Sequence, residues 1–64
     1  MNSTAVTYVV SYYDPERMNQ QDVTRHFDSR YRLDVFVAEE LDKISPNARN
    51  IEMFRIVTKK EKIT

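Results

Sequence analysis

The amino-acid sequence contains no cysteine and no glycine, and His26 is its only histidine. Without cysteine the chain cannot form a disulfide, and one histidine is too few for a zinc site of the usual Cys/His kind. Without glycine, turns must use Asn, Asp, Pro or Ser, and a glycine-rich loop that cradles a phosphate group is excluded. We therefore expect neither a metal nor an organic cofactor.

Long hydrophobic runs are absent as well. No stretch approaches the roughly 20 apolar residues of a membrane span, and the first residues lack the basic region of a signal peptide. The formal net charge is zero, whereas a dedicated nucleic-acid-binding domain is usually strongly basic. These absences predict a cytoplasmic protein without membrane association.

Length and composition indicate one small folded domain over residues 1–64. With 41% hydrophobic and 31% charged residues, the chain is too apolar for a disordered tail. Residues 1–3 and a basic tail over about residues 59–64 are expected to fray. A chain this short buries only about 60% of its unfolded surface, so its stability is marginal. Oligomerisation or binding to another protein remains as a source of extra stability.

The first 13 residues carry no charge. Residues 5–13 are rich in β-branched and aromatic side chains, which predicts a strand over about residues 4–13. A neutral strand at a sheet edge would recruit other chains. We therefore expect this strand in the middle of a sheet, or at an edge that a second protein covers.

The rest of the chain predicts two more strands and one short helix. Residues 14–16, Asp-Pro-Glu, are typical of a helical turn or a tight loop, and irregular or helical structure is expected through about Phe27. Alternating apolar and polar residues favour a strand over about residues 30–37, although a spacing of four also fits a helix there. A helix over residues 38–44 and a last strand over residues 51–58 complete the chain.

These elements give an α+β fold in the order β-β-α-β. A right-handed crossover from the second to the third strand can step over the first strand, which gives a three-stranded sheet in the order 2-1-3. The short helix covers one face of this sheet. The alternative is a βαβ chain with one long helix over about residues 20–44.

The predicted binding surface is the uncovered face of the sheet or, alternatively, the edge of the last strand. Its expected anchors combine aromatic rings with arginine, as interface hot spots do: Tyr13, Arg32, Phe36 and Arg55. The sequence thus predicts a small non-enzymatic protein-binding module, a regulator or inhibitor of a larger protein and/or a homodimer, without a small-molecule substrate. Replacing Phe36 with alanine should then weaken binding by about 1–3 kcal/mol with little loss of fold.

The alternative prediction is a nucleic-acid-binding module. Its contacts would come from basic side chains before the helix and in the tail: Arg25, Arg30, Lys59, Lys60 and Lys62. Catalysis is disfavoured, because His26 has no recognisable nucleophile as a partner. The carboxylates between Asp34 and Asp42 fit a solvated helix start better than a metal site.

Residues 35–42 read Val-Phe-Val-Ala-Glu-Glu-Leu-Asp, a strand that runs into a helix start. This segment resembles part of many small β-β-α-β proteins, among them phage-encoded inhibitors of host polymerases. The resemblance covers only this short, common pattern and identifies no family. It implies a small viral or regulatory inhibitor.

Overall fold

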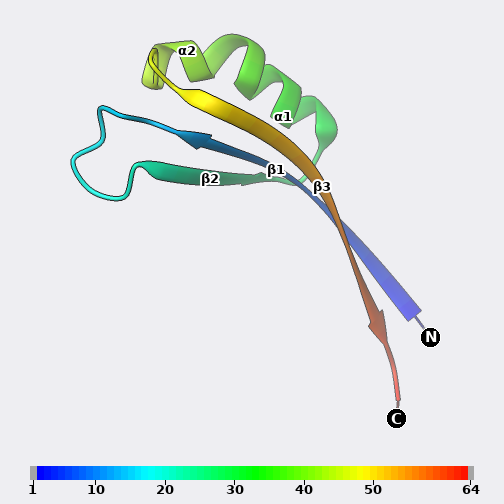
Figure 1. Ribbon diagram of the computed structural model, residues 1–64. Helices are drawn as coiled ribbons and strands as arrows, with labels where there is room; N and C mark the ends of the chain where they lie inside the picture. The colour runs from blue at the N-terminus through cyan, green and yellow to red at the C-terminus, as the bar shows by residue number, and fades with distance from the viewer. Residues whose placement is uncertain (1, 64) are drawn as a thin grey trace.

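The computed structural model describes residues 2–63 and shows a three-stranded antiparallel sheet with a helical layer on one face (Figure 1). The strands are β1 (Asn2–Tyr13), β2 (Asp22–Phe27) and β3 (Arg49–Glu61). The helical layer is α1 (Arg30–Val35), the π-helical segment η1 (Phe36–Glu40) and α2 (Leu41–Ile44). Because the sheet order is β2-β1-β3, the predicted α+β fold and the central position of the uncharged strand are confirmed.

β1 is central because it carries apolar side chains on both faces of the sheet. Val10 and Tyr12 belong to the core beneath the helical layer. Val9 points to the opposite face and is also only 4% exposed, between His26 of β2 and Phe54 of β3 in the strand register. A charged side chain at any of these three β1 positions would lose its solvation without gaining a partner.

The second strand lies earlier in the chain than the sequence predicts. The strand expected over residues 30–37 is wrong, because these residues are helical, and the segment before Phe27 forms β2. Ser29 begins the helix, since its Oγ accepts a hydrogen bond from the N–H of Arg32 at 3.2 Å. The alternative of one helix over residues 20–44 is also wrong, because its first part contains β2.

The helical layer buries its residues at an unequal spacing. Leu33, Phe36 and Leu41 are all buried, although the last two are five residues apart. In an α-helix, residues three or four apart share a face, and residues five apart do not. Within η1, the N–H of Leu41 donates to the carbonyl of Phe36, which makes a wider π turn. This turn keeps Phe36 and Leu41 on the same buried side.

Asp14 and Ser45 connect two loops at one end of the domain. The Asp14 carboxylate accepts a hydrogen bond from Ser45 Oγ at 2.9 Å, and both residues are buried. The same carboxylate accepts the N–H of Glu16 at 3.0 Å, which shapes the turn after β1. The side-chain amide of Asn47 also donates to Glu16. Residues 14–16 therefore form a turn that is tied to the loop between α2 and β3.

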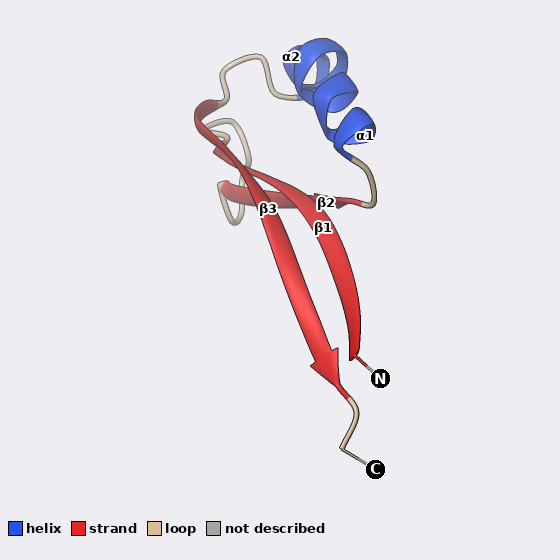
Figure 2. Cartoon of the chain, turned by 90° about the vertical axis from the view of Figure 1, so that its right-hand side faces the viewer, coloured by secondary structure: helices blue, strands red, loops and turns tan. Residues whose placement is uncertain are grey.

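At the other end, β1 and β3 continue past β2. β2 pairs with β1 only from Tyr8 to Tyr13, whereas β3 pairs with β1 from Asn2 onward. Residues 2–7 and 56–61 thus form a two-stranded ribbon, here called the arm, that projects from the rest of the domain (Figures 1 and 2). The longest extent of the molecule is 48 Å.

The arm includes residues 2, 3 and 59–61, which the sequence predicts to fray. Met1 and Thr64, the outermost residues of that prediction, lie outside the described part of the chain. Within residues 2–63, no helix combines the length and the apolar character needed to cross a lipid bilayer.

Candidate functional site

β3 is the most accessible element of the domain. All thirteen of its residues are exposed, and none of them belongs to the core. The helical layer packs over β1 and β2, which leaves β3 beside it rather than under it. β3 lies at an edge of the sheet, so among residues 2–63 the backbone N–H and C=O groups along its outer side have no strand partner. A typical strand has only about 5–6 residues, so this free edge is unusually long.

Apolar side chains lie on both faces of β3. In the strand register, Phe54 and Ile56 stand beside Val9 and Thr7 on the face without the helical layer. Met53 and Val57 point to the other face, opposite Val10 and Val6. These four β3 residues are about half exposed, which is unusual for large apolar side chains that neighbour one another. They define the surface that we call the β3 patch: Met53, Phe54, Ile56 and Val57.

The irregularity of β3 is confined to its first residues. The pairing with β1 shifts between Ser11 and Tyr13, where β3 contains one extra residue, and Asn50 has a positive φ of 56°. Asn tolerates this left-handed conformation better than most residues, which suits a β-bulge. From Glu52 to Glu61 the register is continuous, so the edge beside the β3 patch is regular.

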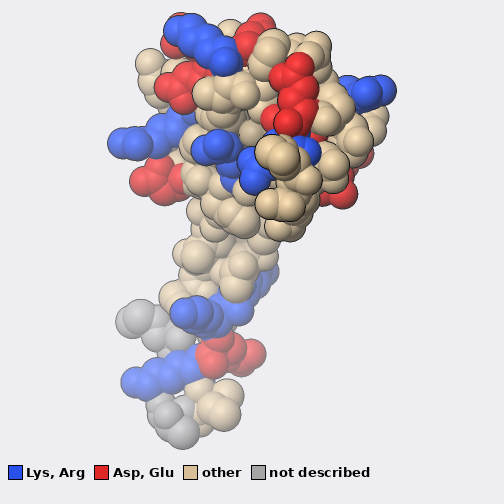
Figure 3. Space-filling view, turned by 90° about the vertical axis from the view of Figure 1, so that its left-hand side faces the viewer, with Lys and Arg blue, Asp and Glu red and all other residues tan. Residues whose placement is uncertain are grey.

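The end of β3 in the arm is basic. Lys59 and Lys60 outnumber Glu61 there, and Lys62 follows directly. In the space-filling view the arm is a narrow stalk below the rounded part of the domain, with Lys and Arg side chains gathered toward its far end (Figure 3).

The predicted anchors do not share one surface. Tyr13 lies at the end of β1, with the guanidinium carbon of Arg49 5.6 Å from its ring centroid. Arg55 is exposed on β3, opposite Tyr8 and thus on the helix-bearing face. Phe36 is only 4% exposed in the core, and Arg32 is exposed on α1. The prediction of one common sheet face is wrong, because residues 30–37 are helical and project from a different layer.

The predicted nucleic-acid contacts divide into two groups. Arg25 and Arg30 have partners within the domain: the Arg25 guanidinium carbon lies 5.2 Å from the Phe36 ring centroid, and Arg30 Nε lies 3.2 Å from an Asp34 oxygen. Lys59, Lys60 and Lys62 lie on the arm or directly after it. Only the lysines therefore lie close together in the sequence, in a segment that Glu61 interrupts.

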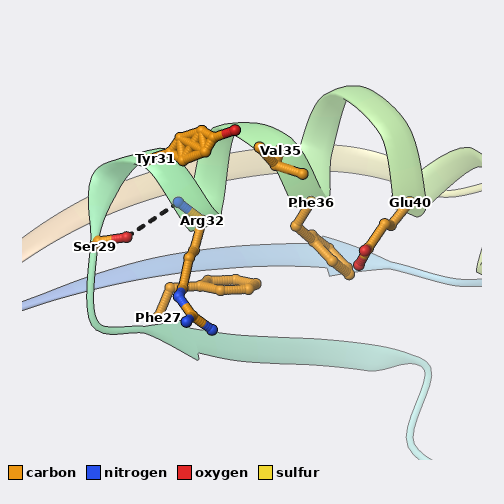
Figure 4. A pocket seen from close by; sticks show the side chains of 7 residues that line it. All are labelled: Phe27, Ser29, Tyr31, Arg32, Val35, Phe36 and Glu40. Atoms are coloured by element: carbon orange, nitrogen blue, oxygen red, sulfur yellow. Dashed lines mark hydrogen bonds between the residues drawn. The ribbon is translucent and has the colours of Figure 1, made fainter.

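A groove of about 510 Å³ lies between α1 and β2 (Figure 4). Phe27 and Phe36 approach each other beneath the helix, with ring centroids 5.3 Å apart, and Arg32 and Glu40 flank them. His26 is not among the lining residues. Within residues 2–63, no group of three His, Asp or Glu side chains is placed to hold a metal ion.

No family model matches the chain, and no curated protein or solved structure shows significant similarity to it. The long exposed edge of β3 is the most prominent feature of the candidate site. The sequence places a binding surface on a sheet face or on the edge of the last strand but does not single out the β3 patch. The sequence does contain a signal for the β3 patch, because apolar residues occupy both alternating sets of positions from Met53 to Val57.

Proposed function

We propose that this chain is a small non-enzymatic protein-binding module that adds a strand of another chain, a larger protein and/or a second copy of itself, to the free edge of β3. In this role it regulates or inhibits the larger protein, forms a homodimer, or does both. The single observation that carries the proposal is the length and full exposure of β3, an edge strand of thirteen residues. The proposal places the module in the cytoplasm, where a chain without cysteine suits the reducing environment.

The physical support is the combination of an unpaired backbone edge with apolar side chains. Strand addition uses main-chain hydrogen bonds for affinity and alternating side chains for specificity. Natural edge strands are usually protected by proline, by charged side chains such as lysine, by inward-pointing charges or by bulges. β3 has no proline, its bulge lies at the end away from the arm, and Lys59 and Lys60 lie near its other end. Between Glu52 and Lys59 its only charged residue is Arg55.

The proposal is tested with two identical substitutions at different places. Met53→Lys introduces a charge into the β3 patch, whereas Met18→Lys introduces the same charge in the loop after β1, where Met18 is 95% exposed. Proteins retained from the native cell extract are identified by mass spectrometry, and the purified partner is then titrated against each variant. We expect Met53→Lys to weaken binding by about 1–3 kcal/mol and Met18→Lys to leave it unchanged. Equal binding by both variants, or a chain that retains no other protein and does not associate with itself, contradicts the proposal.

The basic arm favours a second candidate function, the binding of nucleic acid. A two-stranded ribbon can enter the major groove of DNA, and Lys59, Lys60 and Lys62 would contact phosphates. The affinity should then fall steeply as salt is raised. Lys60→Ala should weaken binding and reduce the salt dependence, while Lys43→Ala on α2 should change neither. Absence of binding to single-stranded or duplex DNA and RNA at low salt excludes this candidate.

A further inference from the structure

We propose that the strand added to β3 is β3 of a second copy of this chain, paired antiparallel around Ile56. The result is a continuous six-stranded sheet whose order in each copy runs β2-β1-β3 toward the centre. This inference rests on the proposed function of β3 as an edge for strand addition. It adds the identity of the partner and the register of the pairing.

Symmetry restricts how two copies of β3 can pair. A two-fold axis perpendicular to the sheet places both helical layers on the same face of the combined sheet. Each β3 residue therefore lies opposite a β3 residue of the second copy whose side chain points to the same face. The regular part of β3 runs from Glu52 to Glu61, and the axes that pair most of it pass at Ile56 or Val57. An axis at Val57 places Arg55 opposite Lys59 of the second copy. Like charges directly opposite each other destabilise a strand pair, which disfavours this register.

The axis at Ile56 gives complementary neighbours instead. On the face without the helical layer, Ile56 meets itself, Phe54 meets Thr58, and Glu52 meets Lys60 of the second copy. An apolar centre is thus flanked on each side by one pair of opposite charges. On the other face, Arg55 meets Val57, so no like charges oppose one another. β3 is therefore complementary to itself in this one centred register.

The pairing would also complete the arm. A two-stranded ribbon alone is marginally stable in water, and a third strand gives it a neighbour along its full exposed side. A short chain without disulfides gains stability from such an association. Because each copy uses the same edge, the contact is closed and the assembly ends at two copies.

Sedimentation equilibrium over a wide concentration range measures the dimer, and charge reversals test its register. Glu52→Lys places two lysines opposite each other at both ends of the interface, and we expect it to raise the dimer dissociation constant about tenfold. Lys60→Glu should have a similar effect. The double variant Glu52→Lys/Lys60→Glu should return the constant to within about threefold of the original. Glu61→Lys makes the same charge change opposite an uncharged Ile51 and should have little effect.

A distance measurement tests the register independently. Because the chain has no cysteine, Glu61→Cys provides a single attachment site for a spin label. With about 3.4 Å per residue, the axis at Ile56 separates the two labelled positions by about 34 Å along the strands, and an axis at Val57 by about 27 Å. A dominant distance near the longer value supports the proposed pairing, and one near the shorter value contradicts it.

The outcomes distinguish this inference from the proposed function. A chain that stays monomeric, yet retains another protein in a way that depends on Met53, overturns the second copy and leaves strand addition intact. A monomer that retains nothing overturns both. A dimer that Glu52→Lys, Lys60→Glu and Met53→Lys all leave unchanged has its interface elsewhere and overturns the pairing of β3 with a second copy. Strand addition is then decided by whether retention of another protein depends on Met53.

Discussion

Replacing Phe36 with alanine should remove most of the stability of this domain. The ring is 4% exposed and packs against Phe27, with 5.3 Å between the centroids, while the Arg25 guanidinium carbon lies 5.2 Å above it. A buried phenylalanine replaced by alanine costs about 3–5 kcal/mol in the free energy of unfolding. A domain of this size is stable by only about 3–10 kcal/mol, and short chains lie near the lower end. The variant should therefore be largely unfolded or close to it.

The matched control is Phe54→Ala on β3. Phe54 is 46% exposed, so its truncation should lower the free energy of unfolding by about 1 kcal/mol in the monomer. Urea unfolding followed by far-ultraviolet circular dichroism measures both variants. A low and fixed protein concentration keeps association from contributing to the difference.

The ranking of the two variants decides the assignment of the core. If Phe36→Ala stays within about 1 kcal/mol of the original chain while Phe54→Ala unfolds it, the helical layer does not pack as described. The expected result also replaces the prediction from sequence, in which Phe36 is an exposed anchor whose loss weakens binding but leaves the fold intact.

Three further experiments test the polar contacts. The hydrogen bond between Asp14 and Ser45 is buried, so a double-mutant cycle with Asp14→Ala and Ser45→Ala should give a coupling of about 1–3 kcal/mol in urea unfolding; additive effects would contradict it. Ser29→Ala removes the helix cap and should lower stability by about 1 kcal/mol, whereas Ser29→Asp should retain it. Arg30→Ala breaks only the exposed ion pair with Asp34 and should change the unfolding midpoint very little; a large shift would show that the pair is structural.

The sequence was sufficient to place β1 and to order the sheet. An uncharged segment with β-branched and aromatic residues at both alternating sets of positions can be buried on two sides, which requires a central strand. With β1 in the middle of three strands the order is 2-1-3, and a right-handed crossover through the helix can connect the two outer strands. Both inferences depend on local sequence patterns, and long-range contacts in the folded domain do not override them.

β2 could not be recognised by the same reasoning. Arg25 occupies a helix-facing position between Val23 and Phe27, where alternation requires an apolar residue. Its guanidinium lies over the Phe36 ring and its Nε donates to Tyr12 Oη at 3.5 Å, so a charged residue covers the core at this position. Such a contact depends on residues far away in the sequence. The strand therefore looks polar until its neighbours are known.

The helix was misread for a different reason. Residues 30–37 alternate as a strand would, and the buried positions of the helical layer do not follow one helical period, because Phe36 and Leu41 are five residues apart. The clearest available signal was Ser29, a residue type that favours the N-cap position. The same error affects the predicted binding surface, because the anchors Arg32 and Phe36 were assigned to a strand. The exposure of β3 could not be predicted from the sequence, because it depends on where the helical layer packs.

The π turn at η1 has a consequence for how this chain tolerates changes in length. Because the turn holds one residue more than an α turn, deleting the exposed Ala38 would leave Phe36 and Leu41 four positions apart, which is the spacing of one helical face. Deleting Asp34 would instead bring Leu33 and Phe36 to a spacing of two and turn one of them toward water. The helix thus contains one position at which a residue can be lost without rotating the segment that follows.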